Sequence, residues 1–139
     1  MSYDGIKTGM KGIIEGLALA PSDEIIDFST ASPNAFAHTY ILFPETGNLD
    51  GTAKESLASW VYDKEIWRMK VAFNRGIHSS FINLDELNRK REEIIKAVDN
   101  PANWTSFARM LNVTEWAVET FENYFVLSIK IEITDTVTY

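Results

Sequence analysis

The side chains best suited to acid–base or metal chemistry lie in two short segments of the sequence. Asp23, Glu24 and Asp27 place three carboxylates close together, and carboxylate oxygens are the ligands that hard cations prefer. Their spacing does not match an EF-hand loop, so we interpret them as solvated charges on a loop. The second segment, His78 with Ser79 and Ser80, sits at the expected start of a helix, and adjacency in sequence does not produce the geometry of a nucleophilic triad.

Other catalytic chemistries lack their residues. The sequence has no cysteine, and its two histidines are His38 and His78. Disulfides, thiol catalysis and thiolate metal sites are therefore excluded, and a structural zinc site is disfavoured. No pair of carboxylates stands out as a glycosidase site, and the aromatic residues alternate with acids rather than bases, unlike a groove for single-stranded nucleic acid. We therefore expect no catalytic, cofactor-binding or metal-binding residues, no cofactor and no enzymatic activity.

Length and composition indicate a single domain over residues 1–139. The hydrophobic share is 45% and the charged share 24%, which is the balance of an ordinary globular chain. The net charge of −7 would repel phosphate backbones unless a local basic patch overrode it. No apolar run is long enough to cross a bilayer and no secretory signal is visible, so we expect neither membrane association nor secretion.

The first predicted element is a helix over residues 3–18, because its apolar residues recur at helical spacing. Four glycines, Gly5, Gly9, Gly12 and Gly16, share one narrow face of this helix. A glycine inside a helix costs about 0.8–1 kcal/mol relative to alanine. We therefore expect this face to lie against another backbone, either within the chain or in a second subunit.

The next segments predict strands and a loop. Residues 25–28 suit a short edge strand, and residues 36–43 suit a central strand with His38 inside it, because apolar groups occur on both faces. The polar residues 44–56 predict a mobile loop. Residues 57–73 alternate like a strand, but the alternation changes phase, which predicts a bend or bulge near residues 63–65.

The second half of the sequence predicts a helix and a hairpin. Residues 80–99 have helical periodicity, and Asn83 with Glu86 has the spacing of a capping box. Residues 115–121 and 124–134 alternate as two strands, with Leu127 toward the core and Lys130 on the opposite side. The order is αββαββ. It predicts an α+β fold with a mostly antiparallel four-stranded sheet and two helices packed on one face.

This layout resembles the tail terminator, or tail completion, proteins of long-tailed bacteriophages. The resemblance rests on the segments 36–43 and 65–73 and on the alternating ending 124–133. It covers most of the chain, but as a pattern of elements rather than a diagnostic motif.

The resemblance implies a structural virion protein that forms a homohexameric ring at the head-proximal end of a phage tail. Such a ring stops polymerisation of the tail tube and meets a head-completion or connector protein, which joins tail to head. DNA would pass through its lumen without specific binding. The implied location is the virion, in the tail or neck, after assembly in the host cytoplasm.

Two other readings remain open from the residues. The first is an acidic protein-binding or inhibitor module that masks a basic partner, which would be a monomer until it binds. The second is a small metal-dependent enzyme that uses Asp23, Glu24 and Asp27.

Overall fold

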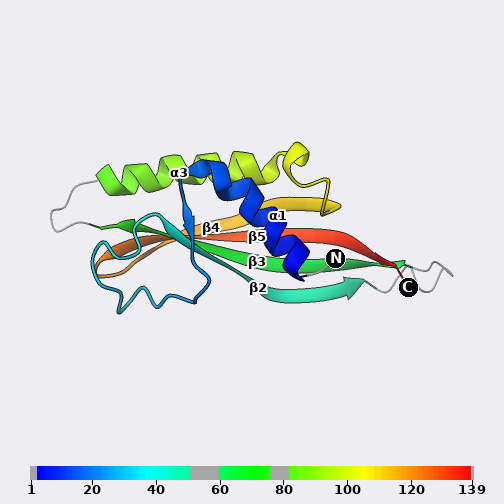
Figure 1. Ribbon diagram of the computed structural model, residues 1–139, viewed down its shortest axis with the longest axis horizontal. Coiled ribbons are helices and arrows are strands. Elements are labelled where there is room, and N and C mark those ends of the chain that lie inside the picture. Colours follow the sequence, from blue (N-terminus) through cyan, green and yellow to red (C-terminus); the bar gives the residue numbers. More distant parts are fainter. Residues whose placement is uncertain (1–2, 51–59, 76–81, 139) are drawn as a thin grey trace.

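Two α-helices lie over one face of a five-stranded sheet in the computed structural model, which describes residues 3–50, 60–75 and 82–138 (Figure 1). The α-helices are α1 (Tyr3–Ile14) and α3 (Ile82–Asp99), and two short 3-10 helices follow them, η1 (Glu15–Leu17) and η2 (Pro101–Asn103). The strands are β1 (Ala20–Pro21), β2 (Thr39–Asp50), β3 (Trp60–Asn74), β4 (Met110–Thr120) and β5 (Tyr124–Thr138).

The strand order is β1-β2-β3-β5-β4, so the last strand of the chain inserts between β3 and β4. β1 pairs parallel with β2, through Ala20 and Thr39, whereas the other neighbours are antiparallel. The predicted four-stranded sheet with the order αββαββ is therefore wrong, because the sheet is mixed and has a fifth strand. A two-residue strand that ends in proline is too short to leave a periodic signal in the sequence.

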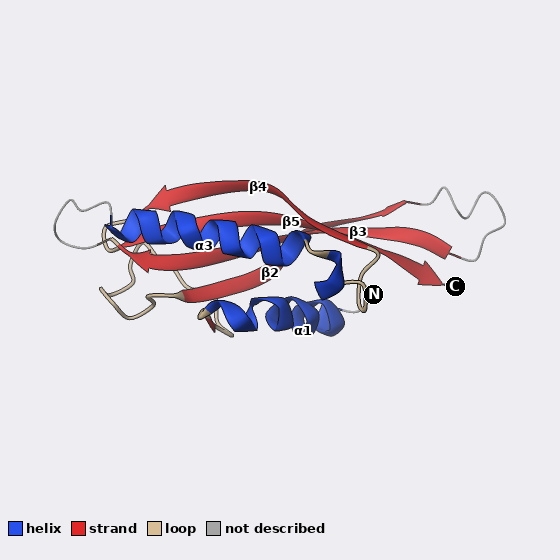
Figure 2. Cartoon of the chain, turned by 90° about the horizontal axis from the view of Figure 1, so that it is seen from above, coloured by secondary structure: helices blue, strands red, loops and turns tan. Residues whose placement is uncertain are grey.

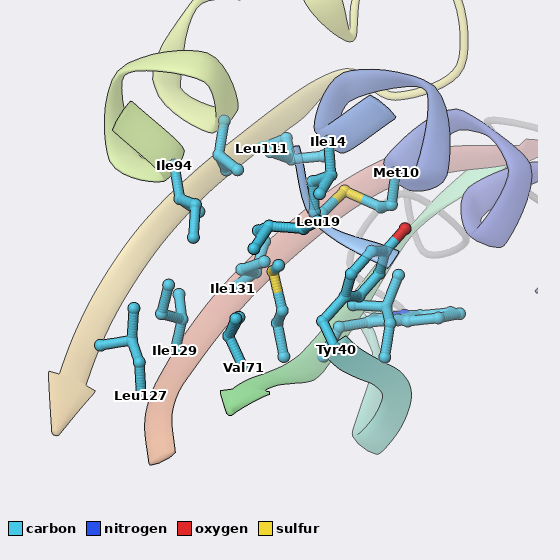
Figure 3. Packing of buried hydrophobic residues seen from close by; sticks show 14 of the residues in the cluster. Met10, Ile14, Leu19, Tyr40, Val71, Ile94, Leu111, Leu127, Ile129 and Ile131 are labelled. Carbon is cyan, nitrogen blue, oxygen red and sulfur yellow. The ribbon is translucent and has the colours of Figure 1, made fainter. Parts of the chain in front are cut away.

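The main core lies between the helices and one face of the sheet, the helix face. Alternate residues of β3 and β5 point to this side, and the buried members include Trp67, Met69, Val71, Leu127, Ile129 and Ile131. The helices cover them with buried side chains at helical spacing: Ile6, Met10 and Ile14 from α1, and Leu87, Ile94 and Val98 from α3. Figure 3 shows Ile94 of α3 pointing toward Ile129, and Met10 of α1 extending toward Ile14 and Leu19. Burial of these apolar surfaces holds the two layers together.

The glycines of α1 are not equivalent. A Cβ at Gly9 would lie 2.5 Å from the ring of Phe107, so this glycine does permit the close approach expected from the sequence. A Cβ at Gly12 or Gly16 would have no described neighbour within 4 Å. The prediction that all four glycines form one close contact is therefore wrong within this chain.

Residues 22–38, here called the strap, cross to the face of the sheet opposite the helices (Figure 1). Phe28 and Ala31 of the strap are buried there against Ala72, Tyr124 and Val126. The Tyr124 hydroxyl donates to the Ser32 carbonyl and accepts a hydrogen bond from the Phe36 N–H. The predicted edge strand at residues 25–28 is wrong, because Phe28 is buried within an irregular segment and no ladder forms there.

Two other boundaries differ from the prediction. β2 begins at Thr39 rather than at residue 36, and strand structure continues through Asp50 where a loop over 44–56 was expected. The segment 51–56 lies outside the described residues. The predicted bulge near residues 63–65 is wrong, since β3 pairs with β5 without a register shift from Trp60 to Asn74. The irregularity is instead in β2, between Pro44 and Thr46, and β4 has a second one between Val113 and Glu115.

One end of the sheet extends beyond the helices, as Figure 2 shows. Here β2 pairs with β3 through Asp50 and Tyr62, and β3 pairs with β5 through Trp60 and Thr138. We call this three-stranded extension, residues 47–50, 60–64 and 134–138, the arm. The arm leaves part of the sheet without a helix over it.

Candidate functional site

The three carboxylates singled out from the sequence lie along the strap and do not converge. Asp23 forms an exposed ion pair with Lys11 of α1, at 3.3 Å. Asp27 accepts hydrogen bonds from the hydroxyl and the N–H of Ser29, and these bonds lower the pKa of the Asp27 carboxyl. Within the ranges that the structure describes, no group of three or more histidines or carboxylates is arranged to hold a metal ion. Nothing in the described residues therefore supports a metal centre at this segment.

A shallow pocket of about 250 Å³ opens beside these carboxylates. Its lining includes Glu24, Ile26 and Phe36 of the strap. Ile25 stands at its rim and is 85% exposed, which is the largest exposure among the big apolar side chains of the described residues. The pocket therefore combines an apolar lining with carboxylates, and among the described residues none that lines it is basic.

His38 lies just before β2, not inside a strand as the sequence predicted. Its φ of 58° is in the left-handed region, and its N–H donates to the Ala72 carbonyl at 2.8 Å. The ring contacts the Glu86 carboxylate of α3 and meets the Phe73 ring edge-on, with centroids 5.5 Å apart. Because both partners of the ion pair are about half exposed, it connects the strap to α3 without forming a buried charge centre.

The predicted capping box is wrong, because α3 begins at Ile82, before Asn83, and Glu86 contacts His38. The other histidine, His78, lies outside the described residues together with Ser79 and Ser80.

Beyond the strap, the second face of the sheet is uncovered and polar. We call it the open face. Its central strands carry Arg68, Lys70, Ser128 and Lys130, and its flanking strands carry Glu45, Glu115 and Glu119. The Arg68 guanidinium bonds both carboxylate oxygens of Glu45, the nearer at 3.0 Å, and donates to the Ser128 hydroxyl at 3.1 Å. Lys70 pairs with Glu119 at 3.3 Å. The Arg68 bonds connect β2, β3 and β5, and the separate Lys70–Glu119 pair connects β3 with β4.

The charges of the open face nearly balance, because each basic residue has an acidic neighbour. Lys130 is the direct cross-strand partner of Glu115, and Lys64 and Glu132 add one charge of each sign farther along the same face. A dense positive field would attract a phosphate backbone strongly, whereas this face presents alternating signs. The open face is therefore suited to polar contacts that hold a phosphate backbone only weakly.

β4 supplies a second exposed feature at the edge of the sheet. Two of the large apolar side chains that stay exposed are on this strand, Met110 at 54% and Trp116 at 45%. The Arg91 guanidinium of α3 lies 3.8 Å from the centre of the Trp116 ring. Such a cation–π contact holds the indole in place while part of it stays open to solvent.

None of the described helices is long and apolar enough to cross a membrane. A scan against protein-family models and a search of curated proteins found no match to this chain.

Proposed function

We propose that this protein is a structural component of a bacteriophage tail, a tail terminator or neck protein. In this proposal the chain assembles as a homohexameric ring at the head-proximal end of the tail, stops polymerisation of the tail-tube protein and joins the tail to a head-completion or connector protein. It acts in the virion after assembly in the host cytoplasm, and it needs no catalytic residue or cofactor.

The arm is the observation that supports assembly best. β2, β3 and β5 continue as a paired sheet beyond the layer of α1 and α3 (Figure 2). A sheet that projects from its core presents unpaired strand edges, and such an edge is a template for pairing with another chain. The arm is therefore an element suited to contact between subunits or with a tail partner, and it has no evident use in a pocket enzyme.

The charge distribution supports the proposal that DNA passes through the ring without specific binding. Each copy carries a net charge of −7, so a ring of copies is strongly acidic as a whole. The open face adds a surface with balanced charges, on which Arg68 and Lys70 are already paired with glutamates. Neither feature favours specific attachment to a phosphate backbone.

Electron microscopy of the full chain with a tail-tube protein tests this proposal. The tube protein would be one encoded beside this chain, and its tubes would be assembled in the presence and absence of the chain. We expect ring-shaped particles at one end of the tubes, and a shorter mean tube length as more chain is added. Tubes of unchanged length with bare ends would contradict the proposal.

One observation favours a second candidate function, an acidic module that binds a basic protein. Ile25 is exposed beside Asp23 and Glu24 at the rim of the strap pocket, an arrangement suited to an apolar side chain flanked by cations. This candidate predicts a monomer that forms a one-to-one complex with a basic partner. Ile25→Asp would weaken that complex and leave ring formation on tubes unchanged, so the variant separates the two functions.

A further inference from the structure

The outer edge of β4 is a strand edge with a definite set of outward backbone groups. The hairpin that joins β4 to β5 closes with the Phe121 N–H donating to the Tyr124 carbonyl, at 2.8 Å. Antiparallel ladders alternate between residues that bond the partner strand and residues that face away. Counting back from Phe121, the N–H and C=O groups of Thr120, Val118 and Trp116 therefore point away from β5.

The edge of β4 is free only on the C-terminal side of the bulge between Val113 and Glu115. Before the bulge, the outward N–H of Val113 donates to the Asp99 carboxylate at the end of α3, at 2.9 Å. After the bulge, no hydrogen bond within the described part of the chain reaches the outward groups of Trp116, Val118 or Thr120. The free edge therefore consists of residues 115–120.

The side chains of residues 115–120 differ between the two faces of the sheet. Glu115 and Glu119 lie on the open face, with Ala117 between them. Trp116 and Val118 lie on the helix face, where Arg91 fixes the indole and Val118 packs against the core. A strand added beside β4 would therefore meet two carboxylates on one face, each of which also has a lysine of the inner strands as a neighbour, and apolar surface on the other.

We propose that this edge accepts an extended segment of a partner protein as a sixth strand. The segment carries Lys or Arg at two positions that are four residues apart. Of the three residues between these cations, the first and the third are apolar. In either strand direction, the cations face Glu115 and Glu119 and the apolar residues face Trp116 and Val118. Main-chain hydrogen bonds supply affinity in this mode of recognition, and the alternating side chains supply specificity. The inference does not rest on the proposed role in a phage tail.

A second copy of this chain suits the edge less well. If two β4 edges paired antiparallel around Ala117, each Glu115 would face a Glu119 of the other copy, and like charges directly opposite are destabilising. Pairing with β2 of another copy is hindered by Pro44, which has no N–H to donate. A cationic partner strand has neither problem.

Amide exchange measured by NMR on the full chain tests the proposal. The probe is the synthetic peptide Ser-Lys-Val-Thr-Val-Lys-Ser, whose pattern reads the same in both directions, and its control has Glu in place of both Lys. We expect the amides of Trp116, Val118 and Thr120 to become protected when the Lys peptide is added, whereas those of Ala117 and Glu119 are protected throughout. The Lys peptide should bind about tenfold tighter than the Glu peptide.

A charge reversal sharpens the test. The double variant Glu115→Lys with Glu119→Lys should prefer the Glu peptide, whereas the control Asp4→Lys with Glu24→Lys, at exposed positions on α1 and the strap, should keep the original preference. Equal affinity of the unmodified chain for the two peptides would overturn the proposal even if the variant failed to fold. Protection of the β4 edge that rises with protein concentration alone would overturn it in favour of a second copy.

Discussion

The two faces of β3 and β5 show how the same strands perform two tasks. On the helix face, Trp67, Met69, Leu127 and Ile129 are all fully buried. On the other face, the same strands carry Ala72, Tyr124 and Val126 beneath the strap and then change to Arg68, Lys70 and Lys130 on the open face. Under the helices the first face is apolar from Trp67 to Phe73, whereas the second changes from apolar to charged within a few residues.

This difference indicates which parts of the molecule maintain the fold and which are available to partners. A face that is apolar throughout must be covered for the chain to fold. A face that changes character is covered only where the strap crosses it, and its charged part tolerates solvent. The following predictions test this division from the largest expected effect to the smallest.

Leu127→Ala should destabilise the chain far more than Lys130→Ala. Leu127 is fully buried under the helices, so truncation should lower the free energy of unfolding by about 2–5 kcal/mol. Lys130 lies on the open face of the same strand, and its truncation should cost less than about 0.5 kcal/mol. Urea denaturation of both variants measures the difference. Equal losses would show that the two faces of β5 do not differ as described.

Gly9→Ala and Gly12→Ala should have opposite effects on stability, because Gly9 lies on a covered side of α1 and Gly12 on an uncovered side. A methyl at position 9 would force the Phe107 ring to move, which should cost about 1–3 kcal/mol. A methyl at position 12 meets open space, so the better helix propensity of alanine should add up to about 1 kcal/mol. Thermal unfolding gives both signs. A stabilised Gly9→Ala variant would contradict the contact with Phe107.

Tyr124→Phe should loosen the strap and leave the helix face intact. The change removes the hydroxyl that bonds Ser32 and Phe36, at a cost of about 1–2 kcal/mol. Hydrogen exchange should speed up in residues 22–38 before it does in α3. As a control, Phe121→Tyr leaves those two bonds in place. If exchange accelerates equally in the strap and in α3, the strap is not a separate unit.

The ion pair between His38 and Glu86 should contribute least. It joins the strap to the helix layer, but both side chains are about half exposed. A double-mutant cycle with His38→Ala and Glu86→Ala should give a coupling energy of about 0.2–1 kcal/mol. A coupling of several kcal/mol would mean that the pair, rather than Phe28 and Tyr124, holds the strap in place.

The alternation of β5 made its core-facing residues predictable from the sequence, because Leu127, Ile129 and Ile131 recur with period two. The same rule placed Trp67 and Met69 on one side of β3. These residues lie in regular strands, so their spacing in the sequence is enough to predict which side of the strand they occupy.

The strap was not predictable in this way. Phe28 and Ala31 are buried and Phe36 is partly buried, at irregular spacing, because a loop that crosses a sheet has no fixed period. Ser128 lies on the same side of β5 as Lys130 and is nevertheless buried, and its hydroxyl accepts a hydrogen bond from Arg68 of the neighbouring strand. The free edge of β4 depends on strand order, which residue patterns within single strands do not specify.

The position of β5 has a consequence for synthesis. β5 lies between β3 and β4 in the sheet, but both precede it in the chain. While the ribosome is still making residues 124–138, β3 and β4 have no strand to join them, and Trp67, Met69 and Val71 lack their neighbours on β5. Domains generally fold as units as their chains emerge, and here the unit is not complete until its last strand is free. The nascent chain therefore leaves one edge of β3 unpaired from the completion of Asn74 until residues 124–138 are made, and a chaperone would protect it best in that interval.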